Sequence, residues 1–366
     1  MHNSNISFPY STFQGFIDHV STKGPNILYP DSSYYFVQMG ATCGLGHRLA
    51  RNAKIYHLAR LLGYRVGVIW QPFKELFRDS EYLLAQKKDP NNKYIFTNEP
   101  GLIEVVHPSR SSAGLINKYL SLLRTFINSG NALPRQNNIN LVGFQDVQCS
   151  NYMDYDLSQF TNRETLKYRL FTEASMASSV HFQILLLSHL RTKWLNKIDK
   201  FLRKYNDLNI IALHMRTGNG EGGDFSHKER EIDTEAILRG FLTHLDSQDI
   251  PVDSVIFVAS DDPCVFDFLQ LNSKLKVIRF CQSLPKKGII TYDWTSGETP
   301  PDRNESNRIN AFFESYADMC ILGYANDLYI SAWTSFVIGS CIFHKLNGKN
   351  GKLKLFDPGD CNWKCC

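Results

Sequence analysis

The sequence predicts an α/β protein that is built from two domains with parallel sheets. In the first half, an apolar strand is followed by a glycine turn, an amphipathic helix and a second strand. From residue 209 onward, apolar strands and helices alternate almost to the end of the chain. The length of 366 residues exceeds what one hydrophobic core usually serves, so we predict domains at 1–190 and 191–366.

The first half carries one clear strand–helix–strand unit. Strands are expected at 34–39 (YYFVQM) and 65–70 (RVGVIW), with the turn GATCGLG and a helix over 47–63 between them. A parallel pair follows from this order. Residues 87–151 are polar and predict no clear element, while 173–205 predicts a long helical run across the domain boundary. The apolar stripe of the first helix comprises Leu49, Ala53, Leu58, Leu61 and Leu62.

The second half repeats the alternation as a second open sheet. Strands are expected at 209–215, 254–260, 274–280, 327–333 and 352–356, and helices at 231–245, 265–272, 308–325 and 334–346. The final segment, GDCNWKCC, is expected to be a frayed end, with lipidation of the terminal cysteines as the alternative. Ligands of such sheets bind outside the carboxyl ends of the strands, so the residues at those ends are the candidates for function.

Composition argues against several classes of protein. The net charge is only +4 and is mixed along the chain, which argues against a nucleic-acid binder. No apolar run reaches the roughly 18 residues of a membrane helix, and no secretory signal pattern stands at the N-terminus. We therefore expect a cytoplasmic protein, or a Golgi or secretory one if a targeting segment precedes this sequence. The nine cysteines form no CxxC pair or zinc spacing, so no metal site is expected.

Arg216 is the leading candidate for a binding residue. It directly follows the apolar strand NIIALHM and precedes the loop TGNGEGGD. A guanidinium binds phosphate oxygens in a fork geometry, and the glycines that follow let the backbone approach a ligand. The sequence therefore predicts a diphosphate site at Arg216, with an inter-domain salt bridge as the alternative.

Two sets of acidic residues stand near these strand ends. Glu221 and Asp224 lie in the glycine-rich loop, where either is a candidate general base or a solvated loop acid. In VASDDP, Asp262 precedes Pro263 and is expected to cap the next helix. Asp261 is then the acid that is freer to accept hydrogen bonds from a ligand such as a guanine ring. Because the acids are adjacent, a magnesium site is a weaker interpretation.

The start of the helix over 334–346 predicts an anion site. Thr334 and Ser335 place hydroxyl and backbone N–H groups together at a helix N-terminus. Simple N-capping by these side chains is the alternative interpretation, and it is compatible with anion binding.

The motifs HMRTGN and VASDDP, followed by a helix, a strand and a second helix that begins with Thr-Ser, resemble the fucosyltransferase superfamily with an HxR motif. It includes α1,6-fucosyltransferases of the nodulation type and protein O-fucosyltransferases. GATCGLGHRL is similar to that family's N-terminal glycine motif, and the resemblance runs from about residue 34 to 346. It implies a GT-B type fold, with two Rossmann-like domains facing across a cleft, and an inverting, metal-independent enzyme that uses GDP-β-L-fucose.

The resemblance also implies roles for individual residues. Arg216 would bind the β-phosphate as a catalytic residue, and His214 would support the site. Core N-glycan enzymes have a second arginine where Thr217 stands, so that particular acceptor is not expected. Other positions on the donor side are Gly218, Asn219, Ser260, Asp261, Asp262, Asp318, Thr334, Ser335 and Phe336. The first domain would hold the acceptor, near Gly44, Gly46, His47 and Arg48.

The activity expected from the sequence is transfer of L-fucose from GDP-fucose to a hydroxyl group of an oligosaccharide or glycoprotein, with α1,6 linkage favoured. No cofactor is expected beyond the donor substrate. Two alternatives remain open: the donor is another nucleotide sugar, or the protein binds a GDP-sugar without turning it over. A dehydrogenase is disfavoured because no acidic residue of the dinucleotide-binding type stands about 20 residues after GATCGLG.

Overall fold

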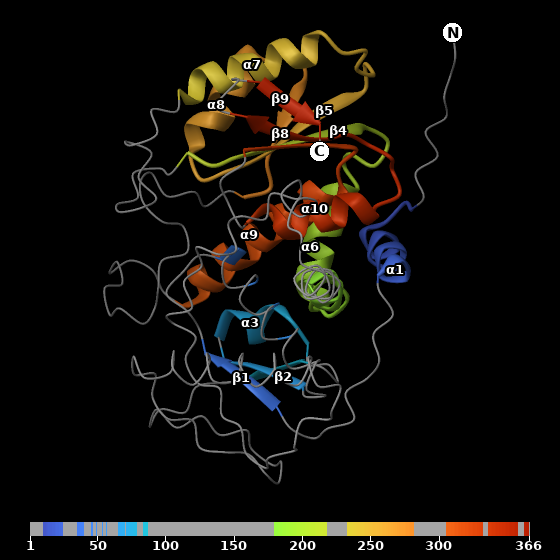
Figure 1. Cartoon of the computed structure of the whole chain (residues 1–366), viewed down its shortest axis with the longest axis vertical. Helices are drawn as coiled ribbons and strands as arrows, with labels where there is room; N and C mark the ends of the chain where they lie inside the picture. The colour runs from blue at the N-terminus through green and yellow to red at the C-terminus, as the bar shows by residue number, and fades with distance from the viewer. Residues whose placement is uncertain are drawn as a thin grey trace, which may run out of the picture.

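The computed structural model describes the chain in separate stretches. They comprise residues 10–24, 35–39, 45–46, 49, 53, 56, 65–69, 71–78, 83–86, 179–217, 233–281, 305–331, 336–357 and 362–365. Within them, the α/β architecture that the sequence predicts is confirmed, with helices packed around two sheets (Figure 1).

The larger sheet has six strands in the spatial order β6-β5-β4-β7-β8-β9. Neighbouring strands are parallel except for β9, which pairs antiparallel with β8. Renumbered from one in chain order, these strands have the spatial order 3-2-1-4-5-6, which is that of doubly wound nucleotide-binding sheets. Their bounds are β4 Asn209–Met215, β5 Ser254–Ser260, β6 Lys276–Ile278, β7 Asp327–Ser331, β8 Leu353–Asp357 and β9 Asn362–Cys365.

Helices cover both faces of this sheet because its central strands are apolar on both sides. In β4, Ile211, Leu213 and Met215 pack with the apolar residues of α7 (Thr234–Asp246) and α8 (Pro263–Asn272). Ile210 and Ala212 belong to the opposite face. That face packs against α6 (Thr192–Leu202), α9 (Glu305–Tyr324) and α10 (Val337–Leu346). The continuous apolar run of β4 thus follows from burial on two sides.

The smaller sheet contains β1 (Tyr35–Met39), β2 (Arg65–Ile69) and β3 (Leu83–Gln86) in that order, all parallel. Between β1 and β2, residues 45, 46, 49, 53 and 56 are helical and buried, which confirms the predicted strand–helix–strand unit. α3 (Gln71–Leu76) follows β2 and packs against α9. In Figure 1, α6 and α9 lie between the two sheets.

The N-terminal helix α1 (Phe13–Lys23) was not expected from the sequence. It packs against α6 and α10, and its Phe13 and Phe16 share an aromatic cluster with Tyr324 of α9. The Phe13 backbone N–H donates a hydrogen bond to the buried Asp199 carboxylate of α6 at 3.0 Å. α1 therefore joins the helical layer that covers the C-terminal sheet.

The helical run predicted over 173–205 is confirmed for its described part, 179–205, but it is interrupted once. Residues 179–188 are helical, and α6 begins only at Thr192. At the break, the Arg78 N–H donates to the His189 carbonyl at 2.7 Å, and the Arg191 N–H donates to the Leu76 carbonyl at 2.8 Å. These bonds to the segment around α3 replace the hydrogen bonds of a continuous helix.

The expectation of a frayed C-terminal end is also wrong. Residues 362–365 form β9, which extends the sheet beyond β8 in an antiparallel register that pairs Phe356 with Trp363. Pairing with an existing strand satisfies backbone groups that an isolated tail would leave to water. The terminal segment therefore forms the edge of the sheet.

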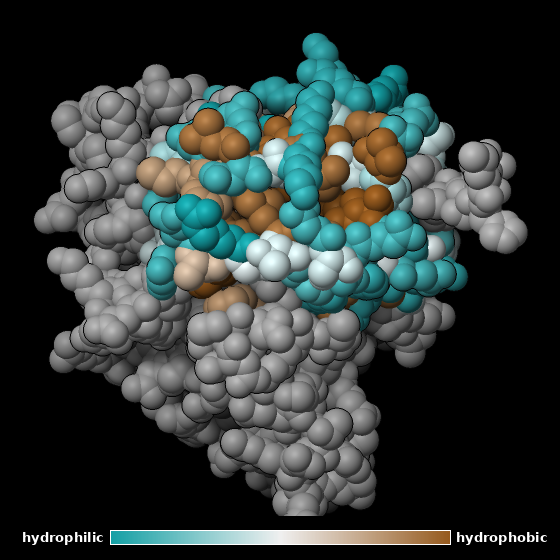
Figure 2. Space-filling model, turned by 90° about the horizontal axis from the view of Figure 1, so that it is seen from above, coloured by the Kyte–Doolittle hydropathy of each residue, from teal (hydrophilic) through white to brown (hydrophobic). Residues whose placement is uncertain are grey.

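The end of the molecule that carries α7 has a mixed surface. Figure 2 looks down on this end, where hydrophilic side chains divide the apolar surface into smaller areas. Among the described residues, Val252 and Leu271 are the large hydrophobic side chains that are exposed. None of the described helices combines the length and the apolar character needed to cross a membrane.

Candidate functional site

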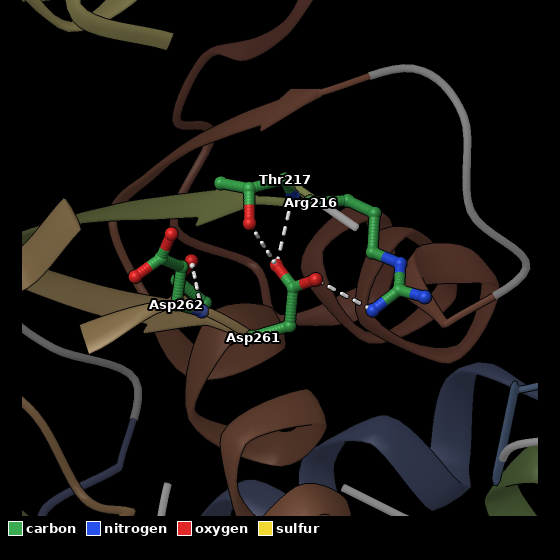
Figure 3. A network of polar contacts seen from close by, with 5 residues as sticks. Arg216, Thr217, Asp261 and Asp262 are labelled. Carbon is green, nitrogen blue, oxygen red and sulfur yellow. Dashed lines mark hydrogen bonds and ion pairs between the residues drawn. The ribbon is translucent and has the colours of Figure 1, made fainter. Parts of the chain in front are cut away.

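Arg216 lies at the carboxyl end of β4 and forms an ion pair with Asp261 at the end of β5. The two strands are parallel, with Met215 opposite Ser260, so the residues that follow each strand meet at the sheet edge. The Arg216 Nη1 atom donates to Asp261 Oδ2 at 2.7 Å. In Figure 3, the Asp261 carboxylate lies between the Arg216 guanidinium and Thr217.

Thr217 binds the second oxygen of the same carboxylate. Its backbone N–H donates to Asp261 Oδ1 at 2.8 Å, and its hydroxyl Oγ1 donates to that oxygen at 3.2 Å. The side chain of Asp261 is only 6% exposed, and that of Arg216 is 23% exposed. The expectation that Asp261 is the freer of the two neighbouring acids is therefore wrong, because both of its oxygens hold the end of β4.

Asp262 has the structural role that the sequence predicts. Its carboxylate accepts the Cys264 N–H at 2.8 Å and caps α8, with Pro263 in the first turn. Its backbone N–H donates to the Ser260 hydroxyl at 3.2 Å. Figure 3 shows the Asp262 carboxylate on the side of Asp261 that is remote from the guanidinium. A contact of Ser260, Asp261 or Asp262 with a donor stays a prediction.

His214 is buried two residues before Arg216 and stacks on Phe336, the N-cap residue of α10. The ring centroids are 5.3 Å apart and the ring planes differ by 23°. Burial, and next the charge of Arg216, lower the pKa of His214 to about 3, so the ring is neutral at physiological pH. Its Nδ1 atom is buried and makes no hydrogen bond within the part of the chain that the structure describes.

These groups gather at the place where the strand order reverses. From β4 the chain moves to β5 and β6 on one side, and it then returns to β7 and β8 on the other. β4 and β7 pair in parallel, with His214 beside Ile330. α10 follows β7, so its N-terminus opens onto the same edge, where Phe336 meets His214. Ligands of doubly wound sheets bind at such a switch point, and the positive end of a helix favours anions there.

Asp318 lies on α9, within the helical layer under the sheet. It is buried, and its Oδ1 atom has no hydrogen-bond partner among the described residues. Burial, and next the charge of Glu314 one turn earlier, raise the pKa of Asp318 well above its usual value, whereas a hydrogen bond with the Cys281 backbone acts in the opposite direction. This environment favours the neutral carboxylic acid, and the donor contact of Asp318 stays a prediction.

Most of the other candidates lie outside the described residues. Gly46 is described, as a buried helical residue between β1 and β2. The other predicted acceptor and donor positions are Gly44, His47, Arg48, Gly218, Asn219, Thr334 and Ser335, together with the two candidate bases Glu221 and Asp224. Their roles stay predictions. Across the described stretches, no group of three or more His, Cys, Asp or Glu side chains is placed to hold a metal ion.

Sequence reasoning missed how Thr217 and Phe336 take part. Thr217 stood out only as a departure from an arginine, whereas it donates twice to Asp261. Phe336 was included by resemblance alone, and its stacking on His214 depends on β4 and β7 being neighbours. The signal that could have found Thr217 is its position. It is the second residue after β4, and Asp261 is the first residue after β5, which pairs with β4 in parallel.

Comparison with known proteins shows similarity in structure rather than in sequence. No protein-family model and no curated protein matches the chain by sequence. NodZ α-1,6-fucosyltransferase co-crystallised with GDP superposes with a TM-score of 0.53 at 14% identity, covering 92% of this chain and 98% of that one. For a second structure, fucosyltransferase NodZ from Bradyrhizobium, the TM-score is 0.51 at 14% identity, with 89% and 96% covered.

A selenomethionine form of the Bradyrhizobium NodZ enzyme agrees, with a TM-score of 0.53 at 13% identity over 92% of this chain and 99% of that one. The matches extend over nearly the whole of both chains, so both halves of the fold contribute to them. The resemblance to the fucosyltransferase superfamily is thereby confirmed at the level of the fold: the chain shares its overall fold with the fucosyltransferase NodZ.

Proposed function

We propose that the protein is a fucosyltransferase that moves L-fucose from GDP-β-L-fucose to a hydroxyl group of a glycan acceptor, with inversion and without a metal ion. An α1,6 linkage is the favoured product. The observation that carries the proposal is Arg216, held by Asp261 at the switch point of a doubly wound sheet, two residues after His214, which stacks on the N-cap residue of α10. The fold shared with an α-1,6-fucosyltransferase that was co-crystallised with GDP supports the choice of nucleotide and sugar.

In this proposal the leaving diphosphate lies at the switch point. Negative charge builds up on GDP as the bond to the fucose anomeric carbon breaks, and an acceptor hydroxyl attacks from the opposite face. Arg216 and the N-terminus of α10 stabilise that charge. His214 remains a neutral ring there, so it offers one N–H donor and one acceptor without adding charge.

The remaining roles rest on the resemblance and on chemistry. The acceptor hydroxyl must lose a proton, and Glu221 or Asp224 is the proposed general base. Such a base contributes about 10²–10⁴ in rate. Two Rossmann-like domains of GT-B type would face each other across a cleft, with the acceptor on the side of residues 1–190 and the donor on the side of 191–366.

The first test is calorimetric titration with GDP in EDTA, on wild type and on Arg216→Ala and Arg216→Lys. We expect metal-free binding to wild type and its loss in Arg216→Ala. Turnover of GDP-fucose by the same variants is the second measurement. Removal of one preorganised charge-stabilising donor typically lowers turnover by about 10²–10³. We expect Arg216→Lys to fail as well, because a point charge on lysine does not reproduce the guanidinium fork. Near wild-type turnover by Arg216→Lys would count against the role given to Arg216.

A binding protein without turnover is the second candidate. Thr217 is the observation that favours it, because this threonine stands where a related enzyme group has a second arginine. GDP-fucose and a panel of chito-oligosaccharide acceptors separate the two candidates. Release of GDP that depends on the acceptor supports the transferase. GDP binding without any transfer supports the silent binder, and a folded wild type that binds no GDP rejects both.

A further inference from the structure

The Asp261 carboxylate is already occupied by the protein's own donors. One oxygen accepts the Arg216 guanidinium at 2.7 Å, and the other accepts both the N–H and the hydroxyl of Thr217. These hydrogen bonds end on a side chain that is 6% exposed. Such a carboxylate is a fixed internal acceptor, and turning it toward a nucleotide would break all three bonds.

We infer that Asp261 is a positioning residue, which acts through Arg216 and holds its guanidinium and the turn after β4 in the orientation that receives the diphosphate. The inference rests on the proposed function, because the diphosphate is the ligand that this orientation serves. It differs from the expectation that Asp261 itself touches guanine or ribose.

The geometry explains why a rigid hold is needed at this place. β4 stops at Met215, and the strand ladder does not fix the side chain of the next residue. A free arginine side chain samples many rotamers, and ordering it opposes ligand binding. Asp261, itself fixed by β5 and by the turn into α8, orders Arg216 before any ligand binds. Preorganisation of this kind lowers the cost of binding.

Thr217 contributes to the same arrangement. With an arginine at 217, the hydroxyl that donates to Asp261 Oδ1 would be absent, and a second cation would compete for the carboxylate. Threonine instead ties the backbone after Arg216 to Asp261 through two bonds. In the turn after β4, the Arg216 guanidinium and the N–H and hydroxyl of Thr217 therefore all bind the Asp261 carboxylate.

Electrostatics alone predicts the opposite effect of removing Asp261. Its negative charge lies beside Arg216 and weakens the attraction of that site for anions. Asp261→Asn keeps nearly the same shape and removes the charge. If attraction dominates, Asp261→Asn binds pyrophosphate more tightly than wild type does, and if orientation dominates, it binds pyrophosphate more weakly.

The experiment is calorimetric titration of the whole chain with inorganic pyrophosphate and with GDP, in EDTA. We expect Asp261→Asn to lose about 10- to 100-fold in affinity for both ligands, which is the scale of a hydrogen bond to a charged group. Thr217→Val, which keeps the backbone N–H and the volume of the side chain, should weaken both ligands by about two- to fivefold. This milder variant carries the test if Asp261→Asn does not fold.

The matched control is Glu235→Gln in α7. It also removes the carboxylate of an arginine pair, Glu235 with Arg239 at 2.6 Å, but on an exposed helix face. It should leave the affinity for both ligands unchanged. Equal or tighter pyrophosphate binding by Asp261→Asn overturns the inference. So does loss of GDP affinity with pyrophosphate affinity unchanged, which would place Asp261 on the nucleoside.

A second readout keeps this inference separate from the proposed function. NMR of the Arg216 side-chain nitrogens measures how fast the guanidinium rotates in the protein without ligand. The signals are assigned by comparison with Arg216→Lys. The rotation rate shows how strongly Asp261 restrains the guanidinium. We expect slow rotation in wild type and faster rotation in Asp261→Asn. If wild type binds no GDP, the proposed function fails while this comparison still decides whether Asp261 orders Arg216. Equal rotation in both proteins overturns the positioning role.

Discussion

Replacement of Lys349 by methionine should make the protein more stable at neutral pH. Lys349 lies in the turn between α10 and β8, with its Nζ atom 3.8 Å from the ring centroid of Tyr324 and 5.5 Å from that of Tyr10. Burial lowers the pKa of Lys349 from 10.5 to about 7. The folded protein therefore disfavours the charged ammonium that the unfolded chain carries freely.

The size of the effect follows from that difference in pKa. At about 1.4 kcal/mol for each pKa unit, the protonated side chain costs about 5 kcal/mol in the folded state. Contact of the ammonium with the Tyr324 ring offsets up to about 2 kcal/mol of this cost, and the residue as a whole is only half-buried, which lowers the cost further. Methionine keeps most of the apolar stem and removes the charge. We expect Lys349→Met to gain about 1–3 kcal/mol in free energy of unfolding at pH 7.

The dependence on pH has a definite sign. Below about pH 7 both states bind the proton, so the cost is fully present. Between about pH 7 and 10.5 only the unfolded chain binds it, so the stability of wild type rises with pH. Burial, and to a smaller extent the charge of Lys349 itself, lower the pKa of His344, so the slope is measured above pH 7. Burial raises the pKa of Tyr324 to about 12.

Urea denaturation between pH 6 and 9 tests this prediction. The advantage of Lys349→Met should shrink steadily from pH 7 upward. Lys345→Met, at an exposed position in the last turn of α10, is the control and should change the stability by no more than about 0.5 kcal/mol at any of these pH values. A Lys349→Met protein that is less stable than wild type at pH 7 would refute the reasoning, since the ring contacts would then outweigh the cost of burying the charge.

Two further predictions concern packing and capping, and both use the free energy of unfolding as the measurement. A Cβ atom at Gly323 in α9 would overlap the Cβ atom of Phe343, so Gly323→Ala should lower the free energy of unfolding by about 1–3 kcal/mol. Gly240 in α7 faces open space, so Gly240→Ala should raise it by about 0.5–1 kcal/mol. Equal effects at both glycines would contradict the helix contact. Asp233 caps α7 by accepting the Ala236 N–H at 3.0 Å. Asp233→Ala should therefore cost about 0.5–2 kcal/mol, and Asp233→Ser much less. Equal stability of these two variants would argue against the cap.

The strands of the large sheet could be predicted because their residues carry the signal themselves. β4 and β5 are apolar on both faces, bounded by polar turns, and their predicted limits agree with the structure. Asp262 could be placed as a cap because Asp-Pro at a helix start is a local pattern. Arg216 could be singled out because the residue after a buried parallel strand faces the ligand edge.

What could not be predicted depends on contacts between distant parts of the chain. α1 is an exception, because the sequence does mark it: Thr12 caps it, and its buried residues Phe13, Phe16, Ile17 and Val20 recur at helical spacing, although its glycine and β-branched residues weaken that signal. β9 exists because β8 offers it an edge. The pairing of Arg216 with Asp261 spans 45 residues and requires the register of β4 with β5. Such long-range pairings leave no periodic trace in one sequence.

During synthesis, α1 leaves the ribosome before any other element that the structure describes. Its N-terminal turn is completed by Asp199, 186 residues later, and its aromatic face by Tyr324 and Phe343. Phe13 and Phe16 therefore remain without these partners until the chain beyond Phe343 has emerged. The apolar face of α1, at the start of the chain, is thus completed by helices from the middle and the end of it.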